Sequence, residues 1–146
     1  MTHVGKVSSL FFSPPPGRTT TSELSFDRKG IVNDKHYDTK IERSVLITSL
    51  DSYALVKSHG IETAYGMLGE NLLIDYNPYT LSSGARLQIA NVVLEISQHC
   101  TLCKSLTNVD SKLPKLLKDD RGIFAKVLEP GSIKLGDDIY LLDNII

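Results

Sequence analysis

The segment 99–104 (HCTLCK) holds both cysteines of this 146-residue chain, Cys100 and Cys103. It directly follows an apolar, strand-like run. The thiolate form of cysteine is the nucleophile and the ligand for soft metals, and neighbouring cations such as His99 and Lys104 would stabilise it. We therefore look first to this segment for any chemistry that the chain performs.

Several roles are open for Cys100 and Cys103. A thiolate could bind a soft metal or carry sulfur. A thioredoxin-like redox pair needs a helix N-terminus within a βαβ unit, and the sequence shows no such unit. A zinc site needs about four ligands, so His99 and His36 would have to converge on the two thiols. Both cysteines could also be buried core residues, as free cysteine often is.

Three other polar segments could contribute to a site. Segment 30–36 (GIVNDKH), with Arg43 shortly after it, gathers an acid, cations and an imidazole in an irregular region, which is typical of loops that bind anions or polar cofactors. Segment 69–72 (GENL) predicts a turn before a strand. Segment 121–125 (RGIFA) places a guanidinium, which can clamp an anion, before a buried strand. Alone, each also fits a simpler role as a solvated loop, a turn or an exposed arginine.

Composition limits the class of protein. Hydrophobic residues make up 41% of the chain and charged residues 23%, which indicates a single globular domain over residues 1–146. The net charge is -1 and no basic block is present, so we expect no nucleic-acid partner. No apolar run reaches the roughly 20 residues of a membrane-spanning helix, and no signal peptide is evident, so we expect no membrane association and a cytoplasmic location. Motifs for phosphate loops, dinucleotides and nucleophile elbows are missing.

The alternation of apolar and polar residues predicts short strands separated by Gly and Pro turns. They are expected at Val4–Phe12, Leu24–Phe26, Ser44–Ile47, Leu72–Ile74, Arg86–Ile89, Val92–Ser97, Gly122–Leu128 and Ile139–Leu142. One clear helix is capped by Ser49 or Asp51 and ends near Gly60. A second, short helix is marked by Leu113, Leu116 and Leu117. The pattern favours a mainly β protein, either a barrel or a sandwich.

Taken in chain order, these segments resemble the MOSC family, the domain found at the C-terminus of molybdenum cofactor sulfurases. The resemblance rests on segments 30–36, 43–47, 69–74, 84–87, 121–128 and 131–137, together with Cys103. It covers nearly the whole chain. It implies a small closed or nearly closed β-barrel, similar to the pyruvate kinase barrel, with a few short helices.

The resemblance also implies a site. In relatives that bind the molybdenum–pterin cofactor, the thiolate at the position of Cys103 is thought to ligate molybdenum, and in sulfurases it is proposed to carry sulfur. Cys100 is a further candidate metal ligand. The implied polar rim, facing the anionic pterin phosphate, consists of Asp34, His36, Arg43, Glu70, Asn71 and Arg121.

Two departures from the family pattern bear on the chemistry. Asn33 stands where the family usually has Gly, although Asn tolerates left-handed backbone angles. Cys100 and Leu102 replace a basic residue and a proline that precede the cysteine in many single-domain members. A subset of relatives carries a second cysteine close by. The second thiol keeps a two-cysteine redox or zinc chemistry open.

Three function hypotheses follow from these residues. In the first, the domain binds the molybdenum cofactor (molybdopterin) through Cys103 and reduces N-hydroxylated compounds, for which it would need a separate electron donor. In the second, Cys103 carries sulfur as a persulfide supplied by a cysteine desulfurase. In the third, Cys100 and Cys103 form a thiol or zinc-binding module. The sequence leaves open whether the protein is an enzyme, which small molecule it acts on and its oligomeric state.

Overall fold

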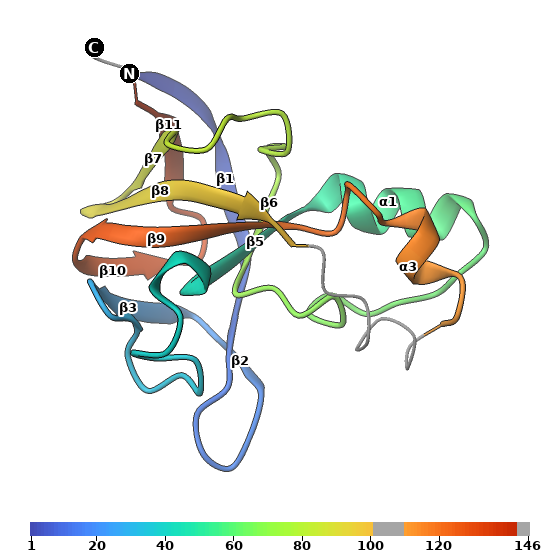
Figure 1. Cartoon of the computed structure of the whole chain (residues 1–146), viewed down its shortest axis with the longest axis horizontal. Helices are drawn as coiled ribbons and strands as arrows, with labels where there is room; N and C mark the ends of the chain where they lie inside the picture. The colour runs from blue at the N-terminus through green and yellow to red at the C-terminus, as the bar shows by residue number, and fades with distance from the viewer. Residues whose placement is uncertain (101–109, 143–146) are drawn as a thin grey trace.

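In the computed structural model, which describes residues 1–100 and 110–142, strands form most of the regular structure (Figure 1). The strands are Thr2–Phe12 (β1), Thr19–Thr21 (β2), Glu23–Asp27 (β3), Gly30–Ile31 (β4), Val45–Ser49 (β5), Leu72–Ile74 (β6), Arg86–Ile89 (β7), Val92–His99 (β8), Ile123–Glu129 (β9), Gly131–Lys134 (β10) and Asp138–Leu141 (β11). The helices are Leu50–Ser58 (α1), Leu113–Leu116 (α3) and a 3-10 turn at Ile41–Arg43 (η1). Each strand and helix expected from the sequence has a counterpart here.

Within the described residues, seven strands close into a barrel in the order β1-β11-β7-β8-β9-β5-β6, with β6 returning to β1. The pairing of β1 with β11, from Thr2 opposite Leu141 to Lys6 opposite Asp138, completes the ring. Neighbouring strands are antiparallel except for β5 and β6, which run parallel. Strand β2 pairs with β1 beside the ring, and β10, β3 and β4 form a second sheet. The predicted small closed β-barrel is therefore confirmed.

Period-two alternation decides which side chains fill the barrel. On β5, Val45 and Ile47 point into the main core and are fully buried, whereas Leu46 between them packs in a separate cluster on the outer face. On β9, Ile123 and Ala125 likewise belong to the main core. The second sheet packs against the same core through side chains such as Leu24 and Ile133.

Helix α1 lies beside α3 past the end of β5 (Figure 1), packs against Leu73 of β6, and connects the two parallel strands. It begins after Ser49, whose hydroxyl accepts a hydrogen bond from the Asp51 backbone N–H at 3.0 Å, as the sequence predicted. It ends before Gly60, which takes a left-handed φ of 75°. Tyr53 and Val56 of α1 share an outer apolar cluster with α3. No helix in the described ranges is long and apolar enough to cross a lipid bilayer.

The side chain of Asn71 joins β5 to β1 where β6 has not yet begun. Its amide oxygen accepts from the Leu46 backbone N–H at 3.0 Å, and its amide nitrogen donates to the Phe11 carbonyl at 3.1 Å. Its backbone N–H donates to the Leu46 carbonyl at 2.8 Å, and its carbonyl accepts from the Phe11 N–H at 2.9 Å. Because Asn71 is buried, these backbone groups have no ready access to water.

We expect Asn71→Ala to lower the free energy of unfolding by about 2–4 kcal/mol, because it leaves a buried N–H and a buried carbonyl without partners. Urea unfolding measures the loss. The matched control is Asn91→Ala, at an exposed asparagine in the turn between β7 and β8, which should change stability by less than about 0.5 kcal/mol. Equal effects of the two substitutions would contradict the bridging role of Asn71.

Candidate functional site

The end of β8 delivers Cys100 to the outer face of the barrel. Its backbone N–H donates to the Gly122 carbonyl at 3.0 Å, which extends the pairing of β8 with β9 by one residue. Its side chain is buried against Leu46 and Phe124. Cys103, the residue expected to carry the chemistry, lies outside the described residues, as do Thr101, Leu102 and Lys104.

Arg43 lies over the apolar wall beside Cys100. Its guanidinium carbon is 5.7 Å from the centre of the Phe124 ring, within cation–π range. The Gln98 side-chain oxygen, in the amide orientation that satisfies both groups, accepts from Arg43 Nε at 2.9 Å and Nη2 at 3.2 Å. The side chain is half-buried, so part of this cation remains accessible to a ligand.

Arg121 directly precedes Gly122, the backbone partner of Cys100, and is 6% exposed. Its Nε donates to the Leu68 carbonyl at 3.1 Å, and its own carbonyl accepts from Thr48 Oγ1 at 2.8 Å. Gly69 covers the guanidinium: a Cβ built on Gly69 would lie only 3.3 Å from Arg121 Nη2, and its φ of 90° also disfavours a side chain. Arg121 is therefore a buried cation beneath a glycine, not an exposed residue at a strand start.

Glu70 is fully buried, although it is acidic. Its Oε2 accepts from Tyr53 Oη at 2.6 Å and from the Gly66 backbone N–H at 3.1 Å. Its Oε1 lies 3.9 Å from Arg18 Nη2 and makes no hydrogen bond with the described residues. Burial raises the pKa of Glu70, and the hydrogen bonds with Tyr53 and Gly66, together with the charge of Arg18, offset this only in part.

Arg18 joins this cluster although nothing in the sequence marked it. Its Nη2 donates to the Gly66 carbonyl at 2.8 Å and to the Glu70 carbonyl at 2.6 Å, and its guanidinium lies over the Phe11 ring at 5.2 Å. It follows a proline-rich turn and precedes a run of threonines, a context with no recognisable signal. Only the fold brings Arg18 to a partner that is 52 residues away.

The segment Gly66–Glu70 is therefore held from two directions. Arg18 bonds to the carbonyls of its first and last residues, and Arg121 bonds to the carbonyl of Leu68 between them. Two guanidinium groups from distant parts of the chain consequently approach one five-residue segment. Asn71 follows directly and anchors it to the barrel.

Asp34 lies in a different region, where it lines a pocket of about 700 Å³ formed by residues 13–18 and parts of the loop 33–37; His36 is in the same loop. Both carboxylate oxygens of Asp34 are used by the backbone: Oδ1 accepts from Ser13 N–H at 2.7 Å and Oδ2 from His36 N–H at 3.0 Å. The His36 side chain is exposed. Arg18 lines this pocket as well and is therefore its connection to Glu70.

His99, the other expected neighbour of the thiols, packs against Tyr79 with their ring centres 6.3 Å apart. Its Nδ1 is buried and has no hydrogen-bond partner among the described residues. The Tyr79 hydroxyl accepts from the Ser49 backbone N–H at 2.8 Å. Among residues 1–100 and 110–142, no group of three or more His, Cys, Asp or Glu side chains is arranged to hold a metal ion.

The MOSC domain family model matches residues 21–140, so this chain belongs to the MOSC domain family. The barrel is similar to that of the YuaD protein from Bacillus subtilis, with a TM-score of 0.81 and 18% identity over 93% of this chain and 94% of that one. It is also similar to YiiM from Escherichia coli, with a TM-score of 0.72 and 15% identity over 96% and 71% of the two chains. YiiM from Geobacillus stearothermophilus gives a TM-score of 0.68 and 14% identity over 97% and 75%. No curated protein matches by sequence.

The burial of Glu70 predicts how stability depends on pH. A Glu side chain in an unfolded chain has a pKa of about 4, and the pKa of Glu70 in the folded protein is higher. Its contribution to stability is thus fully present below about pH 4 and is lost as the pH rises through the folded pKa. We expect Glu70→Gln to become more stable, relative to the unchanged protein, between about pH 4 and pH 7.

Urea unfolding across that pH range measures the difference between the two proteins. The exposed Glu62 provides a matched control as Glu62→Gln. A Glu70→Gln difference that stays constant with pH would rule out a raised pKa at Glu70.

Proposed function

We propose that this MOSC domain binds the molybdenum–pterin cofactor, with Cys103 as the molybdenum ligand. The observation that carries the proposal is the arrangement around Cys100, three residues before Cys103. An apolar wall of Leu46 and Phe124 packs against Cys100. Arg43 lies over Phe124, and Arg121 directly precedes Gly122, whose carbonyl bonds to the Cys100 backbone N–H. A soft thiolate with cations nearby suits a metal bound to an anionic pterin.

The residues present fit such a group. The pterin ends in a phosphate, and a guanidinium binds phosphate through paired N–H donors. Arg43 is half-buried and already oriented by Gln98 and Phe124, so binding costs little side-chain entropy. Gly69 packs closely over the Arg121 guanidinium, so Arg121 supplies a buried positive charge near the site while Arg43 supplies the accessible donors. Glu70 and Asn71 contribute by hydrogen bonds to backbone groups around the site. Asp34 contributes by hydrogen bonds that hold its own loop.

In the proposed activity the domain reduces N-hydroxylated compounds, and the cofactor when bound supplies the oxygen-transfer chemistry. The side chains of this chain bind and orient the cofactor, and Leu46 and Phe124 keep water from the buried Cys100 side of the site. Electrons would come from a separate donor protein, because the sequence has no flavin or iron–sulfur motif. A persulfide on Cys103, supplied by a cysteine desulfurase, is the alternative that the experiment below separates.

The test is molybdenum and pterin analysis of the protein purified from cells that make the cofactor. We expect near-stoichiometric molybdenum and pterin in the unchanged protein and loss of molybdenum in Cys103→Ser. Cys100→Ser should retain both, because the Cys100 side chain packs inside the apolar wall. Arg43→Met should weaken pterin binding about tenfold and so lower pterin occupancy, since it removes one charge-assisted contact. The matched control, Arg28→Met at an exposed arginine on the far sheet, should leave occupancy unchanged.

Absence of molybdenum and pterin from the unchanged protein would refute cofactor binding. Mass spectrometry for a persulfide on Cys103 would then distinguish the sulfur carrier. Equal losses of molybdenum in Cys100→Ser and Cys103→Ser would instead indicate that both thiols ligate the metal. Stoichiometric zinc without molybdenum, lost in both variants, would indicate the zinc module.

A further inference from the structure

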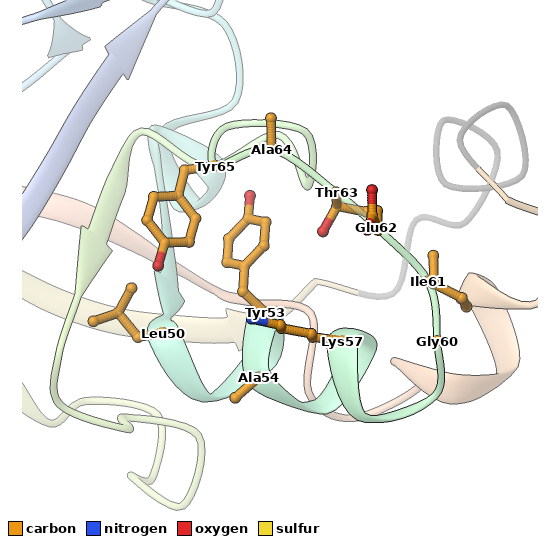
Figure 2. Close-up of a pocket in the computed structure, with 10 residues that line it drawn as sticks. All are labelled: Leu50, Tyr53, Ala54, Lys57, Gly60, Ile61, Glu62, Thr63, Ala64 and Tyr65. Atoms are coloured by element: carbon orange, nitrogen blue, oxygen red, sulfur yellow. The ribbon is translucent and has the colours of Figure 1, made fainter.

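The arginines of the proposed site are supported in two different ways. Arg121 is held by the Gly66–Glu70 segment, which Tyr53 of α1 supports through hydrogen bonds. Figure 2 shows Tyr53 rising from α1 beside Tyr65, in a pocket of about 1010 Å³. Arg43 instead ends the 3-10 turn η1, which packs beside β8 and β9. The position of Arg43 therefore depends on how η1 is held on these two strands.

The turn η1 has little apolar surface with which to dock on the barrel. It is a single turn of three residues, none of them is buried, and its N-cap residue Lys40 makes no side-chain cap hydrogen bond. Ile41, its apolar residue, is 38% exposed. Burial of apolar side chains supplies most of the energy that docks a helical segment on its neighbours. Polar contacts must therefore do much of this work for η1.

Ser97 and Lys126 make such contacts with Glu42, the residue before Arg43. Ser97 Oγ donates to the Glu42 carbonyl, and Lys126 Nζ lies 3.4 Å from Glu42 Oε1. Lys126 Nζ also lies 3.5 Å from Oε1 of Glu95, its cross-strand partner on β8. Two acidic side chains, one on η1 and one on β8, thus meet at one lysine of β9. Such a network holds its members more firmly than an isolated exposed ion pair does.

Lys126 and Phe124 lie on the same face of β9. They are two residues apart, and Ala125 between them belongs to the main core, so both side chains are on the outer face. Phe124 carries the Arg43 guanidinium over its ring, and Lys126 pairs with the neighbouring Glu42. Strand β9 therefore holds two consecutive residues of η1, one through an aromatic ring and the other through an ammonium group.

We propose that Lys126 is a positioning residue for Arg43, the accessible cation of the cofactor site. Through Glu42 it fixes η1 on β9, so that the Arg43 guanidinium is already in place over Phe124 when the ligand arrives. The inference rests on the proposed function, because it takes this ligand to be the pterin phosphate. Preorganisation lowers the side-chain entropy that binding costs, and the effect expected from one partly exposed ion-pair network is about threefold in affinity.

The first test follows the Arg43 Nε–Hε signal by ¹H–¹⁵N NMR in the full chain without added cofactor, and Arg43→Met identifies that signal. In the unchanged protein we expect an ordered side chain, with a ¹⁵N order parameter close to that of Arg121 Nε. Lys126→Met should lower the order parameter of Arg43 and leave that of Arg121 unchanged. Lys126→Arg, which keeps the charge, should restore it. An Arg43 order parameter that does not fall in Lys126→Met would overturn the proposal.

The second test measures the rate at which pterin dissociates from the protein purified from cells that make the cofactor. Lys126→Met should release pterin about threefold faster. In a protein that already carries Arg43→Met it should cause no further acceleration, because its effect passes through Arg43. The matched control is Lys6→Met, at an exposed lysine that pairs with Asp138 where β1 meets β11. This control should release pterin at the unchanged rate.

The two tests separate failure of this inference from failure of the proposed function. Absence of pterin from the unchanged protein would refute the proposed function, and the NMR test would still decide whether Lys126 orders Arg43. Pterin that is bound but dissociates at the same rate from Lys126→Met would overturn this inference alone. So would an acceleration by Lys126→Met that persists in the Arg43→Met background. Thermal unfolding checks that each variant is folded.

Discussion

The region around the proposed cofactor site depends on the burial of one carboxyl group, that of Glu70. A buried carboxyl group destabilises a fold unless hydrogen bonds and opposite charges surround it. Tyr53 from α1, the backbone of Gly66 and the guanidinium of Arg18 provide them. Meeting these needs fixes the conformation of the Gly66–Glu70 segment. That segment in turn presents the carbonyl that holds Arg121 beside Cys100. The positions of Arg18 and Arg121 thus both depend on how the buried carboxyl group of Glu70 is accommodated.

The features that sequence could predict are those with a local cause. Strands β7 and β8 were found from the alternation of Leu87 and Ile89 with polar neighbours, and Ala90 supplies the left-handed residue of the turn between them, with a φ of 53°. The start of α1 is predictable because serine is a favoured N-cap residue, and the Ser49 hydroxyl indeed accepts from the Asp51 backbone N–H only two residues away. The barrel closure came from the family resemblance, since the pairing of β1 with β11 joins the two ends of the chain.

The features that sequence could not predict depend on contacts across the fold. Arg18 gave no signal, because its partners are 48 and 52 residues away. Glu70 was recognised as part of a motif, but nothing indicated that Tyr53 would bind its carboxyl group in the interior. The same is true of Asn71, whose amide bonds to two different strands. The role of Cys103 stays a prediction from the family pattern.

The parallel pairing of β5 and β6 follows from the odd number of strands in the barrel. Around a closed ring each antiparallel neighbour reverses the strand direction, so a ring of seven cannot be antiparallel throughout, and at least one pair must run parallel. A parallel pair cannot be joined by a tight hairpin and requires a long crossover connection. Here the crossover is α1 with residues 59–71, and it carries the pocket with its two tyrosines, the buried Glu70 and the carbonyl that holds Arg121. The odd strand number thus leaves a long excursion outside the barrel wall, and this excursion supplies the segment that holds Arg18 and Arg121 in place.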